Sequence, residues 1–269
     1  MLHLLRQLFY FLQSDPNKLK KKIFLYFVFI ALLTPLIYNC SSSKGSDIQT
    51  DDPEQAFKIA KGKFDAGDYV DAIEDFSFIK IKFPGTSNAD QVQFYLAESY
   101  YMRGEHLLAA YEYETLLRNY PLSPLIPDTR YKLGLSYYKL SPKYQLDQEF
   151  THYAISELQT YLELYPTDKH VADAEAKLRE LKDKLAYKDY RTGELYMGLR
   201  DFKSAAIYYA NVYETYIDSQ WADDAMLGHA EALINIKKSE EAKKVLDRFY
   251  KLFPGSTLKS RADRLKSNL

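Results

Sequence analysis

Residues 67–85, GDYVDAIEDFSFIKIKFPG, contain the pattern that recurs along this chain. A turn-forming Gly-Asp pair precedes a segment in which an alanine is followed twelve residues later by a proline. The recurring residues are Ala72, Ala109, Ala154, Ala205 and Ala242, with Pro84, Pro121, Pro166 and Pro254. Successive alanines are 37, 45, 51 and 37 residues apart. A period in this range predicts a solenoid of stacked helical units, which would bind partners over an extended surface.

Each repeat predicts two helices joined by a tight turn. In the first repeat, Asp52 and Pro53 are suited to begin a helix that runs to about Ala66. The Gly67-Asp68 turn precedes a second helix over residues 70–82, with apolar residues at helical spacing. Proline closes the unit because it lacks the N–H and clashes with the preceding turn.

The whole pattern predicts an all-α fold, a right-handed superhelix of five helix pairs with a C-terminal capping helix. The expected units cover residues 53–86, 87–123, 124–168, 169–219 and 220–254, with a cap over residues 256–267 that begins at Ser256. The 45-residue step places about eight extra residues between the helices of the third unit, around residues 141–147. The 51-residue step adds a helical stretch, which predicts one long helix over residues 171–199.

The phased positions resemble the tetratricopeptide repeat. Its small residue on the first helix matches Ala60, Ala97, Gly134, Gly193 and Ala230, and its bulky residue on the second helix matches Phe76, Tyr113, Leu158, Tyr209 and Leu246. Small residues are needed where two helices cross closely, and large ones fill the space one turn further on. The terminal proline is replaced in the fourth unit by Ile217.

Residues 1–39 have the pattern of an export signal. A lysine cluster at residues 18–22 precedes an apolar run over residues 23–38, which is shorter than the roughly 20 residues of a membrane-spanning helix. Cys40, the chain's one cysteine, follows at once, and residues 36–40, LIYNC, resemble a bacterial lipobox. We expect Cys40 to carry S-diacylglycerol and an N-acyl chain such as palmitate, and residues 40–52 to form a flexible lipid-anchored tether. An uncleaved signal anchor is the alternative, and the true start codon is open.

Charge and motifs argue against an enzyme and against a nucleic-acid partner. Removal of the signal leaves 31 Lys and Arg against 36 Asp and Glu, a net charge of −5, whereas phosphate binding needs a basic face. The histidines are dispersed: His3, His106, His152, His170 and His229. The sequence has no phosphate-binding loop or nucleophile elbow. We therefore expect no catalytic residue, no metal and no cofactor other than the lipid on Cys40.

Four short stretches and the irregular third unit resemble the BamD family of outer-membrane assembly lipoproteins. They are Asp147-Gln148, Ala154-Ile155 with Tyr165-Pro166, and residues 181–186, LKDKLA. The resemblance implies a scaffold of the outer-membrane β-barrel assembly (BAM) complex at the periplasmic face of the outer membrane. Its C-terminal repeats would bind the barrel-forming subunit, alongside accessory lipoproteins, and its N-terminal repeats would receive unfolded outer-membrane proteins.

The resemblance leaves two questions open. Tyrosines could form a groove for an extended, aromatic-ended peptide, with Tyr69, Tyr95, Tyr100 and Tyr101 as candidates, or they could serve in packing between helices. Tyr208 stands where the family often has an arginine that supports contact with the barrel subunit, so that contact does not carry over. Other lipid-anchored repeat proteins of the envelope, such as pilotins of pilus or secretion systems and coordinators of cell-wall synthesis, are the alternative function.

Overall fold

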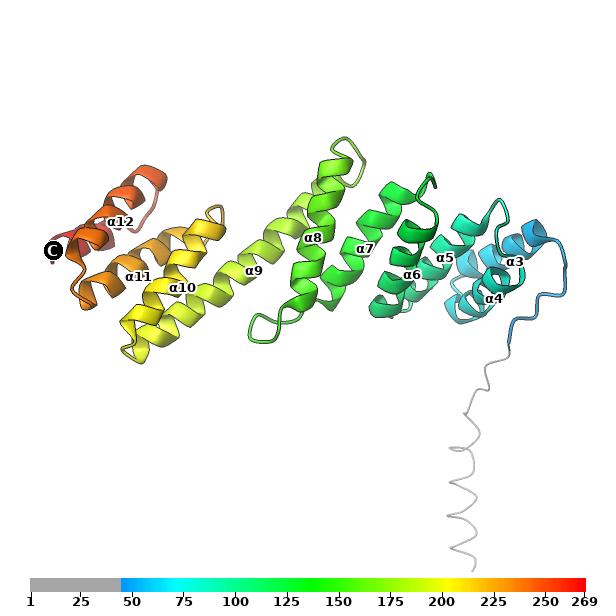
Figure 1. The fold of residues 1–269 in the computed structure, drawn as a ribbon, viewed down its shortest axis with the longest axis horizontal. Coiled ribbons are helices and arrows are strands. Elements are labelled where there is room, and N and C mark those ends of the chain that lie inside the picture. The colour runs from blue at the N-terminus through cyan, green and yellow to red at the C-terminus, as the bar shows by residue number, and fades with distance from the viewer. Residues whose placement is uncertain (1–44) are drawn as a thin grey trace, which may run out of the picture. The chain divides into compact units, whose positions relative to one another are not determined.

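The computed structural model describes residues 45–269 (Figure 1). The described helices all belong to one compact unit, Ile48–Leu269. The predictions of a signal peptide and of lipidation at Cys40 lie outside the described residues. Among the described helices, none is both long enough and apolar enough to cross a membrane.

All regular secondary structure in the described part of the chain is helical, as predicted, and each helix packs against the next along the sequence (Figure 1). The helices are α3 (Pro53–Ala66), α4 (Tyr69–Lys82), α5 (Ala89–Met102), α6 (His106–Asn119), α7 (Ile126–Leu140), α8 (Glu149–Leu164), α9 (Val171–Gly198), α10 (Phe202–Thr215), α11 (Ala222–Asn235), α12 (Ser239–Leu252) and α13 (Lys259–Lys266). Consecutive members from α3 to α12 form five pairs, and α13 follows the last pair.

The helix ends follow from local chemistry. Asp52 begins α3, and its carboxylate accepts the backbone N–H of Glu54 at 2.9 Å. Gly67 ends the helix with φ of 87°, a left-handed conformation that glycine adopts without steric cost. The long helix was also predicted correctly, since α9 runs unbroken for 28 residues from Val171 to Gly198.

The start of the last helix was predicted wrongly. Leu258, not Ser256, is the N-cap of α13, and its side chain makes no capping hydrogen bond. The Ser256 hydroxyl instead accepts the N–H of Leu258 at 3.1 Å and donates to the Asp223 carboxylate at 2.7 Å. Ser256 therefore shapes the turn before α13 and ties it to α11, a long-range role that the local sequence does not reveal.

Small residues on one helix receive large residues from its partner, as the repeat phasing predicts. The five recurring alanines are all fully buried. A Cβ atom placed on Gly134 of α7 would lie 2.8 Å from Leu158 of α8, and one on Gly193 of α9 would lie 2.8 Å from the ring of Tyr209 of α10. The helices of each pair therefore approach so closely that the glycine positions leave no room for a side chain.

Replacing Gly193 by alanine should destabilise the protein. The added methyl meets the buried Tyr209 ring, and overpacking of this kind costs about 1–3 kcal/mol. That cost exceeds the roughly 1 kcal/mol by which alanine favours a helix over glycine. The matched control is Gly62→Ala in α3, where a Cβ meets nothing within 4 Å and only the helix-forming gain applies. Thermal unfolding should show a lower Tm for Gly193→Ala and a raised one for Gly62→Ala; shifts of the same sign would contradict this packing.

Candidate functional site

The four tyrosines predicted to form a peptide groove lie in the first two units, and all are half-buried: Tyr69, Tyr95, Tyr100 and Tyr101. Tyr95 of α5 is surrounded by rings, with centroid distances of 5.9 Å to Phe57 and 5.3 Å to Phe64. Tyr69 packs edge-on against the same Phe64 at 5.5 Å. Tyr69 and Tyr95 therefore belong to one aromatic cluster, in which much of each ring is used for packing.

Tyr101 lies toward the third unit. Its ring is 5.1 Å from that of His106, and the Lys132 ammonium lies 5.0 Å from its centroid. Burial raises the pKa of the Tyr101 phenol, and the nearby carboxylates of Glu98 and Asp173 raise it further. Tyr100 packs against the apolar clusters of the first and second units. The predicted groove residues therefore lie in two neighbouring parts of the helix stack. Tyr69 and Tyr95 lie in the aromatic cluster of the first unit, and Tyr101 lies beside the third unit.

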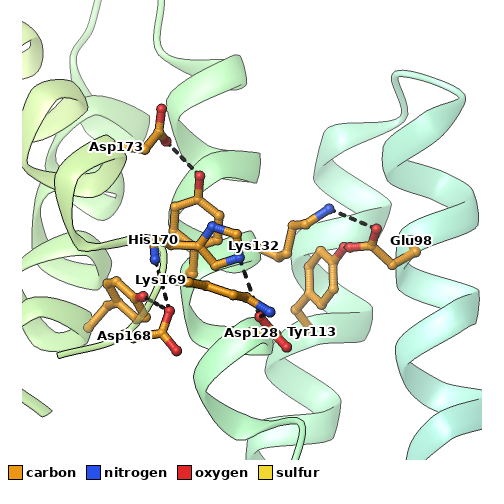
Figure 2. A network of polar contacts seen from close by, with 10 residues as sticks. Glu98, Tyr113, Asp128, Lys132, Asp168, Lys169, His170 and Asp173 are labelled. Carbon is orange, nitrogen blue, oxygen red and sulfur yellow. Dashed lines mark hydrogen bonds and ion pairs between the residues drawn. The ribbon is translucent and has the colours of Figure 1, made fainter. Parts of the chain in front are cut away.

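A polar network that the sequence analysis missed joins the second and third units (Figure 2). The Lys132 ammonium of α7 lies 2.7 Å from Oε2 of Glu98 on α5. Glu98 also accepts a hydrogen bond from the hydroxyl of Tyr113 on α6. Tyr113 is fully buried, and burial together with Glu98 raises its phenol pKa well above the usual value. One carboxylate thereby links three helices.

The second half of the network connects α7 to the start of α9 (Figure 2). Tyr131 stacks on His170 with 4.1 Å between ring centroids and donates to the Asp173 carboxylate at 2.6 Å. Asp128 lies 3.0 Å from the Lys169 ammonium and 3.4 Å from Nε2 of His170. Burial tends to raise the pKa of Asp173, but hydrogen bonds from Tyr131 and Lys177 outweigh it and lower the pKa.

These pairings indicate a structural role for the network. Each labelled carboxylate in Figure 2 accepts a hydrogen bond or forms an ion pair. Glu98 is the buried one, and pairing is how a buried charge is normally tolerated. Asp168, for example, accepts the backbone N–H of His170 at 3.0 Å and the Tyr161 hydroxyl. Over residues 45–269, no cluster of His, Cys, Asp and Glu has the arrangement of a metal site. The network fixes how α5, α7 and α9 follow one another, and so positions the tyrosine-bearing surface.

Comparisons with known proteins agree with the repeat architecture. The family model described as "Outer membrane lipoprotein" (YfiO) matches residues 49–232, and a tetratricopeptide-repeat model matches residues 224–256. The TPR2AB domain complex of yeast Sti1 also matches, at 16% identity and a TM-score of 0.40 over 80% of this chain and 81% of that one.

Two curated relatives carry the name outer membrane protein assembly factor BamD. The protein from Vibrio cholerae is 24% identical over 75% of this chain and 87% of its own length. The protein from Pasteurella multocida is 23% identical over 74% of this chain and 80% of its own length. Because the lipoprotein model spans well over half of the residues, the protein belongs to the YfiO family of outer membrane lipoproteins.

Proposed function

We propose that the protein is a lipid-anchored scaffold subunit of the outer-membrane β-barrel assembly complex, and that it acts by binding, without catalysis. The observation that supports this most directly is the alignment with assembly factors over at least 80% of the length of the Vibrio and Pasteurella proteins. A stack of helix pairs suits the role, because it offers long side-chain-rich faces to several partners at once.

Its partners would be the barrel-forming subunit and the accessory lipoproteins, bound mainly through the C-terminal repeats. At the family's arginine position, Tyr208 stacks on Tyr196 with a centroid distance of 5.4 Å and an interplanar angle of 15°. An aromatic ring engaged in this way replaces a guanidinium that would form charge-assisted hydrogen bonds. The barrel subunit would therefore be held by other residues of α9 to α13.

The complex can be tested by affinity purification of the tagged full-length chain from detergent-solubilised envelopes. The barrel-forming subunit should co-purify in stoichiometric amount, since scaffold contacts in a stable complex survive mild detergent. Charge-reversed Arg248→Glu, on the exposed surface of α12, tests whether the C-terminal repeats contribute, and Lys58→Glu on α3 is the matched control. Recovery of a secretion or pilus component in place of the barrel subunit would refute the proposal and favour a pilotin.

The anchor would be the lipidated Cys40, which holds the protein at the periplasmic face of the outer membrane. Cys40→Ala should abolish acylation and release the protein from the membrane fraction, because each acyl methylene buried in the bilayer contributes roughly 0.8 kcal/mol. Labelled palmitate incorporation and fractionation measure the two effects, with Ser41→Ala as the control. Incorporation of palmitate by the Cys40→Ala variant would rule out this anchor.

The N-terminal repeats would receive unfolded outer-membrane proteins as extended, aromatic-ended peptides. The exposed parts of the half-buried tyrosines offer apolar rings with hydrogen-bonding hydroxyls, which suit such a ligand. Tyr101 is the most informative position, because its ring borders both the α5–α6 turn and Lys132 of the next unit.

Tyr101→Ala should weaken binding of a fluorescent phenylalanine-ended strand peptide at least about tenfold, which corresponds to about 1.4 kcal/mol. Fluorescence anisotropy with the full-length chain gives the Kd. Tyr153→Ala is the control, because Tyr153 is exposed on α8 and bonds to Glu149 of its own helix. If the two variants bind the peptide with equal affinity while both retain the native Tm, the tyrosines serve packing alone.

A further inference from the structure

Two hollows border helix α9, one beside the ends of α8 and α10 and the other beside residues 220–221, just before α11. The first, of about 540 Å³, has an aliphatic wall of Leu162, Leu178 and Ile217; we call it the aliphatic hollow. The second, of about 520 Å³, is bordered by Tyr187 and Trp221, whose rings lie 4.5 Å apart; we call it the aromatic hollow. Their volumes fall within the range of ligand-binding clefts.

The hollows arise where the chain departs from its own repeat. At 28 residues α9 is far longer than the 14 to 16 residues of α3 to α8, and the difference is visible in Figure 1. Leu162 packs on the apolar cluster of the third unit and Tyr216 on that of the fourth, so the aliphatic hollow lies between two separate clusters. Ile217 replaces the proline that closes the other units, and its side chain is 37% exposed. It contributes apolar surface and a backbone N–H that proline lacks.

Arg179 and Asp183 line both hollows. They are one helical turn apart on α9, so they form a ridge between the two hollows. Arg179 is exposed and makes no ion pair among the described contacts, whereas Asp183 accepts the backbone N–H of Gln220 at 3.3 Å. The ridge thus presents a strong donor beside an acceptor.

The charges select the kind of ligand. Arg179 and Lys182 stand beside Glu175, Asp183 and Asp218 around the aliphatic hollow. A ligand of one net sign would be attracted by part of this rim and repelled by the rest. A polypeptide backbone instead offers alternating carbonyl acceptors and N–H donors, which match a rim of mixed sign, and its side chains can fill apolar hollows on either side.

We propose that the Arg179–Asp183 ridge is a second polypeptide-binding site, at which an extended segment crosses α9 with one apolar side chain in each hollow. A helix is roughly 10 Å across and an extended chain advances about 3.3 Å per residue, so the two anchoring side chains would be three to four residues apart. The identity of the segment as part of an unfolded outer-membrane protein rests on the proposed function; the site itself does not.

Trp221 makes the proposal testable in the native chain, because it is the protein's one tryptophan and borders the aromatic hollow. The probe is a tryptophan-free serine peptide carrying two leucines separated by three serines, titrated into the full-length protein in liposomes. We expect a saturable change in Trp221 emission, with Kd raised at least about tenfold by Arg179→Glu and by Ile217→Asp. Lys203→Glu, an exposed change on α10 that lines neither hollow, should leave Kd unchanged.

Three results would overturn the site: no saturable emission change, an equal response to a leucine-free serine peptide, or unchanged affinity in both hollow variants. Circular dichroism and Tm confirm that each variant is folded. Tyr101→Ala should leave the Trp221 titration unchanged, because Tyr101 lies on α5. If aromatic-ended peptides fail to bind at the tyrosines, the N-terminal groove is contradicted and the ridge site is not. If the Trp221 titration fails, the ridge site is contradicted and the N-terminal groove is not.

Discussion

The ring of Tyr209 sets the spacing of the central helices. It lies between two glycines of different helices: a Cβ on Gly193 of α9 or on Gly228 of α11 would fall 2.8 Å from its ring atoms. Burial of such a side chain stabilises the fold by about 1.5–3 kcal/mol. The ring fits between the two helices because both contact positions are glycine. The same arrangement, with Leu158 against Gly134, fixes the third unit. Because each contact joins only neighbouring helices, the units stack without any residue having to reach across the whole chain.

This dependence on local contacts explains which features the sequence could predict. The alanine and proline spacing predicted the helix pairs, and the excess length of the 51-residue step predicted α9. Gly134 and Gly193 were recognisable as close-contact positions because the repeat phase placed them opposite bulky residues. These features could be predicted because the residues that produce each of them lie within one helix pair.

Contacts between units were not predictable in this way. Glu98, Tyr113 and Lys132 come from three helices, and no spacing within one helix identifies them as partners. A glutamate within a largely apolar stretch of α5 was the available signal, but its burial and its partners could not be known without the structure. Ser256 shows the same limit, since its bond to Asp223 of α11 competes with the helix-capping role that its local sequence suggests. Sequence also could not separate exposed from packed tyrosine surface, as Tyr95 within its cluster of phenylalanines illustrates.

Two charged regions of the molecule differ in whether their side chains already have partners. In the network around Glu98 and Asp173, the carboxylates already have partners, so an incoming ligand would have to displace bonds that hold the units together. Around Arg179 the donor is exposed and without an ion pair among the described contacts, and apolar walls lie on either side. A ligand that binds the Arg179 guanidinium displaces no ion pair among the described contacts and removes apolar surface from water. The apolar clusters of the third and fourth units share no residue, and the aliphatic hollow beside α9 lies between them. This is the surface that we propose recognises an extended chain.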